Sequence, residues 1–102
     1  MDLNKIEQAL MAIKASSGTD IGEYSVDLFI QHHLEELSDS EWVKAIGSKK
    51  PTNNQILESL VLKSCWDKGL VYDFSLPHDI TDYVVSVRFD ESGSIEAISM
   101  EG

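Results

Sequence analysis

Residues 70–76 have the sequence Leu-Val-Tyr-Asp-Phe-Ser-Leu, and the spacing of apolar residues changes at this stretch. From Leu70 onward, a large apolar side chain stands at every second position. Before Gly69, apolar residues instead recur every three or four positions. Spacing of two is typical of a half-buried strand, and spacing of 3.6 is typical of an amphipathic helix. The sequence therefore predicts helices before Gly69 and a sheet after it.

Two further strands are predicted after this one. Residues 77–79 (Pro-His-Asp) form a turn that leads into residues 83–89, which are rich in β-branched and aromatic side chains. Residues 90–93 (Asp-Glu-Ser-Gly) predict a second tight turn, after which residues 94–100 return as the last strand. Helices followed by three antiparallel strands constitute an α+β fold.

Four helices are predicted in the first two thirds of the chain. Three of them begin with a Ser, Thr or Asn placed three residues before a Glu or Gln, which is the spacing of a capping box. These pairs are Asn4 with Glu7, Ser38 with Glu41 and Thr52 with Gln55. The predicted helices cover residues 4 to about 18, 25–37, 38–47 and 52–68.

The apolar faces of these elements predict one hydrophobic core. Its predicted members are Phe29, Ile30, Leu60, Val61, Val85 and Val87. Cys65 lies on the apolar face of the fourth predicted helix, so we expect a buried, unreactive thiol. A chain of 102 residues is long enough to bury such a core without disulfides or metals. We therefore expect a single globular domain over residues 1–102.

The chain is strongly acidic, with 18 Asp and Glu against 8 Lys and Arg and a net charge of −10. This field repels nucleic acid and anionic membranes, and it speeds association with a basic partner. The chain also lacks the basic, aromatic-interleaved patch that nucleic-acid binding needs. A single Cys, an N-terminus without the layout of a signal peptide and no long apolar run predict a cytoplasmic protein.

The acidic residues are concentrated in two segments. Residues 15–43 contain seven acids and no base, and residues 73–102 contain seven acids and one base. The first segment also carries Tyr24 and Trp42, and aromatic side chains beside charge of one sign are typical of a binding surface. Trp42 fits the core equally well. The predicted partner-binding residues are Asp20, Glu23, Tyr24, Asp27, Glu35, Glu36, Asp39, Glu41 and Trp42. In the second segment the candidates are Asp79, Asp82, Asp90 and Glu91.

No arrangement of residues typical of catalysis or metal binding is found in the sequence. It contains no glycine-rich nucleotide loop, no nucleophile motif and no carboxylate pair at a recognisable spacing. His32 and His33 are adjacent, so on a helix they diverge by about 100° and do not easily share one metal ion. We expect no enzymatic activity, no cofactor and no metal site. A small enzyme built from scattered residues is the alternative.

In size, in negative charge and in its helices followed by a short antiparallel sheet, the chain resembles the small acidic immunity proteins of bacterial polymorphic toxin systems. These include the immunity proteins of contact-dependent growth inhibition. Residues 82–101 are similar to the closing hairpin of several such domains. The resemblance implies a cytoplasmic inhibitor that binds one cognate toxin domain, often a nuclease, and occludes its basic active-site face. An acidic adaptor or regulatory subunit of another protein complex is the alternative.

Overall fold

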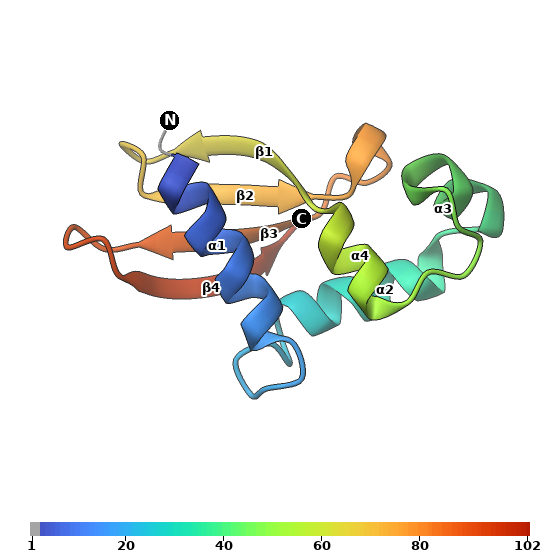
Figure 1. Ribbon diagram of the computed structural model, residues 1–102, viewed down its shortest axis with the longest axis horizontal. Helices are drawn as coiled ribbons and strands as arrows, with labels where there is room; N and C mark the ends of the chain where they lie inside the picture. The colour runs from blue at the N-terminus through green and yellow to red at the C-terminus, as the bar shows by residue number, and fades with distance from the viewer. Residues whose placement is uncertain (1–2) are drawn as a thin grey trace.

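The computed structural model describes residues 3–102, in which four helices precede an antiparallel sheet (Figure 1). The helices are α1 (Leu3–Ser16), α2 (Val26–Glu36), α3 (Asp39–Ile46) and α4 (Asn53–Ser59), and a short 3-10 helix, η1, covers Pro77–Asp79. The strands are β1 (Val61–Trp66), β2 (Val71–Ser75), β3 (Val84–Phe89) and β4 (Ile95–Glu101). The α+β prediction is confirmed, but the sheet has four strands rather than three.

The additional strand comes from residues that the sequence assigned to the fourth helix. That helix ends at Ser59, and β1 begins at Val61 and pairs with β2, with Trp66 opposite Val71. The backbone groups of this segment bond to a neighbouring strand, so partner pairing overrides the helical spacing. Two further predictions depended on this helix, and both are wrong. Val61 is 40% exposed and does not join the core, and Cys65 is only half-buried.

The sheet is a meander in which each strand pairs with its neighbour in the chain, so β1 and β4 are its edges. The predicted turn before β4 is confirmed. The Asp90 carboxylate accepts hydrogen bonds from the backbone N–H groups of Ser92 (2.9 Å) and Ser94 (3.0 Å). The hydrogen bond from the Ser92 hydroxyl, together with these backbone bonds, favours the charged carboxylate and lowers the pKa of Asp90.

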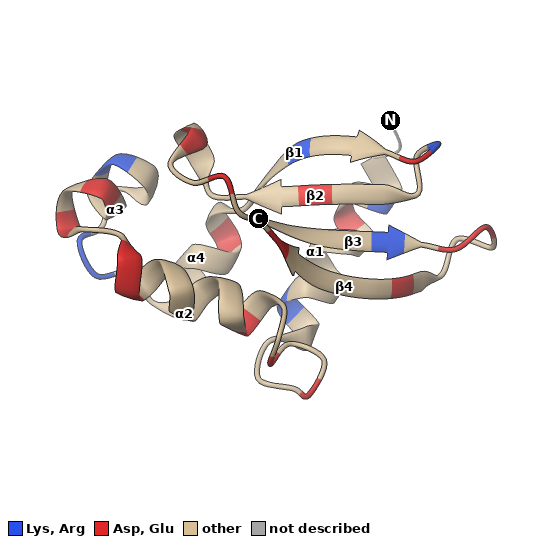
Figure 2. Ribbon diagram, turned by 180° about the vertical axis from the view of Figure 1, so that it is seen from behind, with Lys and Arg blue, Asp and Glu red and all other residues tan. Residues whose placement is uncertain are grey.

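Helices cover one face of the sheet, which we call the inner face. α1 crosses this face, and the remaining helices lie toward one end of the strands (Figure 1). Seen from behind, the outer face carries no helix within the described residues (Figure 2). The core lies between the helices and the inner face and includes five of its six predicted members. These are Phe29, Ile30, Leu60, Val85 and Val87, all at most 7% exposed.

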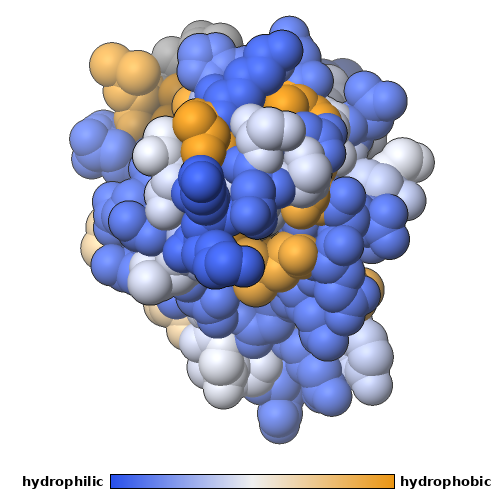
Figure 3. All heavy atoms as spheres, turned by 90° about the vertical axis from the view of Figure 1, so that its right-hand side faces the viewer, coloured by the Kyte–Doolittle hydropathy of each residue, from blue (hydrophilic) through white to orange (hydrophobic). Residues whose placement is uncertain are grey.

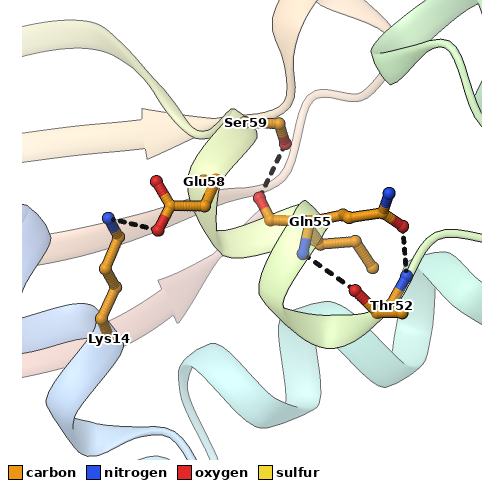
Figure 4. Close-up of polar contacts among 6 residues, drawn as sticks. Lys14, Thr52, Gln55, Glu58 and Ser59 are labelled. Atoms are coloured by element: carbon orange, nitrogen blue, oxygen red, sulfur yellow. Dashed lines mark hydrogen bonds and ion pairs between the residues drawn. The ribbon is translucent and has the colours of Figure 1, made fainter.

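Two of the three predicted capping boxes are present. Thr52 and Gln55 cap α4, with the Thr52 hydroxyl accepting from the Gln55 N–H at 3.1 Å (Figure 4). Ser38 and Glu41 cap α3 in the same way. Asn4 is not a cap, because α1 already begins at Leu3. Figure 4 also shows an ion pair of 3.0 Å between Lys14 and Glu58, which joins α1 to α4.

Candidate functional site

The predicted partner-binding residues separate into two groups, one at each end of α2. This helix has 11 residues and is therefore about 16 Å long. At its N-terminal end lies a group that we call the loop surface, which comprises Asp20, Ile21, Glu23 and Tyr24. At its C-terminal end lies the helix corner, which comprises Glu35, Glu36, Asp39 and Glu41. Acids that belong to one segment of the sequence thus form two separate surfaces in the fold.

The loop surface belongs to the connection between α1 and α2, residues 17–25, which is folded into successive turns. The Thr19 N–H donates to the Ser16 carbonyl at 3.0 Å, and the Gly22 N–H donates to the Thr19 carbonyl at 3.1 Å. The Ser25 N–H then donates to the Gly22 carbonyl at 3.1 Å. Because each turn bonds to the one before it, the loop holds a defined conformation.

Asp27 fastens this loop to the start of α2. One carboxylate oxygen accepts from the Ser17 hydroxyl at 2.6 Å, and the other accepts from the Gly18 N–H at 2.7 Å. The Asp27 N–H in turn donates to the Gly22 carbonyl at 2.9 Å. Asp27 was predicted to bind a partner, but its carboxylate is occupied in positioning the loop.

Gly22 is the point at which the loop passes closest to α1. A Cβ atom at this position would lie 2.2 Å from the carbonyl oxygen of Ser16, which is far inside contact distance. No other residue can replace Gly22 without moving the backbone. The close approach packs the loop against the end of α1 and adds to its rigidity.

The rigid loop holds two large apolar side chains in solvent. Ile21 is 66% exposed and Tyr24 is 75% exposed, and both Asp20 and Glu23 beside them are exposed. Aromatic and aliphatic anchors supply most of the energy at the centre of protein interfaces. A loop that is already ordered also loses little entropy on binding. The loop surface therefore combines charge, anchors and preorganisation.

Two hollows adjoin the loop surface and share Thr19 and Asp20. The first, which we call the apolar hollow, has a volume of about 590 Å³ and lies between α1, the loop and β4. Its lining is Ala12, Ala15, Ser16, Thr19, Asp20, Ile21, Ile95 and Ile98. The second, the acidic hollow, measures about 400 Å³ and is lined by Gly18, Thr19, Asp20, Glu23, Asp27 and Gln31. Among the described residues, no Lys or Arg lines either hollow.

The helix corner uses its acids differently. The Glu41 carboxylate accepts from the Ser38 N–H at 3.0 Å, and this hydrogen bond lowers the pKa of Glu41. Asp39 and Glu41 also stand in the first turn of α3, where negative charge complements the helix dipole. Lys44 follows in the last turn of the same short helix. This end of the molecule presents mostly hydrophilic residues (Figure 3).

Trp42 does not belong to a binding surface. Its side chain is 2% exposed and packs in the hydrophobic core, on the same face of α3 as the buried Ala45. The prediction that Trp42 contacts a partner is therefore corrected. A tryptophan suits both a hydrophobic core and a binding surface, and the packing of α3 places this one in the core.

His33 is buried and joins α2 to the segment after η1. Its Nδ1 donates to the Phe29 carbonyl at 2.6 Å, which leaves Nε2 to accept from the Thr81 hydroxyl at 2.8 Å. We assign this neutral tautomer because a carbonyl oxygen can only accept. Burial lowers the pKa of His33, and the nearby His32 acts in the same direction. Within residues 3–102, no three His, Cys, Asp or Glu side chains are grouped to hold a metal ion.

The outer face of the sheet carries a polar cluster centred on Asp73. Its carboxylate accepts from the Ser64 hydroxyl at 2.9 Å, from the Trp66 indole N–H at 3.0 Å and from the Ser86 hydroxyl. Asp73 and Arg88 both line a hollow of about 370 Å³ on this face. The Arg88 side chain is paired with the Asp67 carboxylate at 2.7 Å. The Asp73 carboxylate is thus engaged in bonds that tie neighbouring strands together.

Cys65 lines another hollow, near the start of α1, together with Lys5 and Lys68. The residue lies on the edge strand β1 and is only half-buried. The expectation of a fully buried thiol is therefore wrong.

Comparison with known proteins assigns no family to this arrangement. No protein-family model, no curated protein and no solved structure was found to match the chain. In the part of the chain that the structure describes, no helix combines the length and apolar character needed to cross a membrane. Inferences about function therefore rest on the surfaces described above.

Several residues of the loop surface and its hollows were missed by sequence reasoning. Ile21 carried a usable signal, because it is a lone large aliphatic residue in a turn-rich, polar segment. Ala12 and Ala15 carried none, since small residues are common on any helix. Ile95 and Ile98 stand more than 70 positions after Ile21 in the chain, and only the fold brings them beside it.

Proposed function

We propose that this protein is an immunity protein that binds a cognate toxin domain with a basic surface and occludes its active-site face. The observation that supports this most is the loop surface, where exposed Ile21 and Tyr24 stand beside Asp20 and Glu23 on a preorganised loop. The net charge of −10 and the acidic hollow favour a basic partner. The proposed compartment is the cytoplasm, where such a toxin would act.

The two kinds of side chain have separate roles in this proposal. Acids at the rim of an interface raise the association rate by steering a basic partner, and salt weakens this effect over a Debye length of about 8 Å at physiological ionic strength. Buried anchors such as Tyr24 and Ile21 slow dissociation. A protector needs both properties, because it must reach its toxin quickly and then hold it. Occlusion requires no catalytic group on the inhibitor.

The direct test asks whether a gene adjacent to this one encodes a toxin-like domain, and it uses that domain as the partner. Cells that produce that domain alone should stop growing, and co-production of this protein should restore growth. With purified proteins, the toxin's activity should be inhibited at one-to-one stoichiometry. The association rate should fall markedly as salt is raised from low to high concentration.

Two variants with the same net charge distinguish binding through the loop surface from attraction by the overall charge of the protein. Replacing Asp20 and Glu23 by Ala should weaken protection by slowing association, whereas replacing Glu35 and Glu36 by Ala should leave it largely intact. If cells that produce the toxin domain still stop growing when the wild-type protein is co-produced, the proposal is overturned. Tight binding to a basic protein that is not a toxin would instead favour the acidic adaptor.

A further inference from the structure

The apolar hollow joins parts of the molecule that are distant in sequence. Ala12 and Ala15 come from α1, Ile21 from the loop, and Ile95 and Ile98 from the edge strand β4. Its volume of about 590 Å³ lies in the range of about 300–1,000 Å³ that is typical of ligand pockets. It is large enough to receive at least one bulky side chain of a partner.

The walls of this hollow expose apolar surface that the fold does not cover. Ile21 is 66% exposed and Ile95 is 37% exposed, although the loop that carries Ile21 is held by its own hydrogen bonds. Covering such side chains contributes about 25 cal/mol for each Å² of apolar surface removed from water. A partner that fills the hollow would gain this energy without any rearrangement of the loop.

The charge next to the hollow indicates what kind of partner segment fits. Asp20 lines both hollows, and Glu23 and Asp27 line the acidic one. Asp27 already accepts two hydrogen bonds within the protein, so Asp20 and Glu23 are the carboxylates exposed to a partner. An apolar pocket bordered by these two acids is complementary to an apolar side chain that stands next to a Lys or Arg.

The segment is expected to enter by its side chains and not by adding a strand to β4. The pairing of β3 with β4 shifts register, so that Phe89 faces Ile95 and Arg88 faces Ala97. Glu96 is therefore the extra residue of a bulge on the edge strand. Bulges and charged residues at a sheet edge disfavour the addition of another strand.

We propose that the apolar hollow receives an aliphatic or aromatic side chain of the toxin domain, with an adjacent Lys or Arg of the toxin paired to Asp20 and Glu23. This inference rests on the proposed function and adds the anchoring chemistry to it. The hollow sets the dissociation rate, and the two acids set the association rate.

The test fills the hollow without changing any charge. Ala15 is exposed, so Ala15→Trp should fold normally while its indole occupies the space between α1 and Ile21. The matched control is Leu3→Trp, which adds an indole to an exposed position at the other end of α1. Binding of the adjacent-gene toxin domain is measured by surface plasmon resonance at low and high salt.

We expect Ala15→Trp to raise Kd by about tenfold or more through a faster dissociation rate, because the pocket for an anchor is blocked. The salt dependence of association should stay as in the wild type, and Leu3→Trp should bind normally. A second variant, Ile21→Thr, trims one wall and should weaken binding in the same way. In methyl NMR spectra of the wild-type complex, the signals of Ala12, Ala15 and Ile98 should shift.

The outcomes separate the two proposals. If the toxin domain binds the wild type and both hollow variants equally well, the anchoring inference is wrong while the proposed function stands. If binding persists but the methyl signals of the hollow do not move, the same conclusion follows. If the toxin domain does not bind the wild type at all, the proposed function fails, and this inference fails with it.

Discussion

The loop surface and the helix corner carry the same kind of residue but use it in opposite ways. In the loop, the carboxylate of Asp27 is spent on holding the backbone, and Asp20 and Glu23 are left in solvent beside two exposed apolar side chains. At the corner, Glu41 caps a helix, and Lys44 lies one turn further along. The loop surface thus leaves two acids beside its most exposed apolar side chains, whereas the helix corner uses one of its acids as a helix cap.

This contrast shows that the sign of charge along a sequence is a weak guide to binding. A run of acids becomes informative when some carboxylates order the backbone and others stand next to exposed apolar groups. The distinction depends on hydrogen bonds and burial. Both are properties of the fold, so the predictions below test whether the two surfaces really differ in function.

The largest expected difference lies between the two aromatic residues that mark these regions. Trp42→Ala removes a buried side chain and should lower the free energy of unfolding by about 3–5 kcal/mol. Tyr24→Ala removes an exposed one and should change it by less than about 0.5 kcal/mol, while weakening partner binding. Urea denaturation and toxin binding measure the two effects. A Trp42→Ala protein with wild-type stability and no binding would reverse the assignment.

Asp27→Asn tests whether the loop surface is held in place. The amide replaces one of the two acceptor oxygens with an NH2 donor, so the bonds from Ser17 and from the Gly18 N–H to separate oxygens cannot both be kept as they are. We expect a loss of about 1–2 kcal/mol in unfolding free energy and faster hydrogen exchange at Gly18. The matched change at the corner is Ser38→Ala, which should cost about 1 kcal/mol of stability and leave binding unchanged. Unaltered exchange at Gly18 would show that Asp27 does not order the loop.

Paired charge reversals compare the two surfaces in variants that have the same net charge as each other. Asp20→Lys with Glu23→Lys changes the total by the same amount as Glu35→Lys with Glu36→Lys, so the general field is matched. We expect the loop pair to slow association with the toxin domain by about tenfold at low salt, and the corner pair to slow it by no more than about threefold. Stopped-flow measurements give both rates. Equal effects would mean that only the overall field matters.

The smallest effect is expected from His33, in the last turn of α2. Its pKa in the folded protein lies below the ordinary value of 6.5, so just below pH 6.5 the unfolded chain binds a proton that the folded protein does not. The stability contributed by neutral His33 is therefore complete above pH 6.5 and is lost as the pH falls. Urea unfolding at pH 7.5 and 5.5 should show a larger loss for the wild type than for His33→Gln. Identical losses would contradict the assignment.

Much of the fold could be predicted from sequence because local signals agreed with the tertiary structure. Ser38 and Thr52 mark helix starts by side-chain bonds to nearby backbone groups, which need no distant partner. The alternation around Tyr72 and Phe74 predicted a strand, and both side chains lie in the core, although Val71 and Ser75 on the other face are buried as well. In these places local chemistry alone decides the structure.

The segment from Leu60 to Trp66 could not be predicted in the same way. Its apolar residues continue the helical spacing of Ile56 and Leu57, and no Gly or Pro interrupts them. The chain nevertheless turns to strand after Ser59, because β2 offers backbone partners to most of the segment, with a register shift between Leu62 and Ser64. Short apolar runs fit both periods, and the choice depends on a strand that comes later in the chain.

The candidate site was predicted only in part for a related reason. Asp20, Glu23 and Tyr24 were found because charge and aromatic character are visible in the sequence. Glu35 and Glu36 looked equivalent to them in the sequence. Only the fold shows that they lie at the opposite end of α2. The apolar hollow could not be anticipated, because it forms where the first and last elements of the chain meet.

That meeting of first and last elements has a consequence for protein synthesis. Chains emerge from the ribosome at about 5–20 residues per second, so Ile95 follows Ile21 by roughly 4–15 seconds. During that interval the acids of the loop are already present, but the wall supplied by β4 is not. A nascent chain would attract a basic partner without retaining it. Under the proposed function, tight binding would begin only when the last strand pairs, so retention of the proposed partner would itself report that the fold is complete.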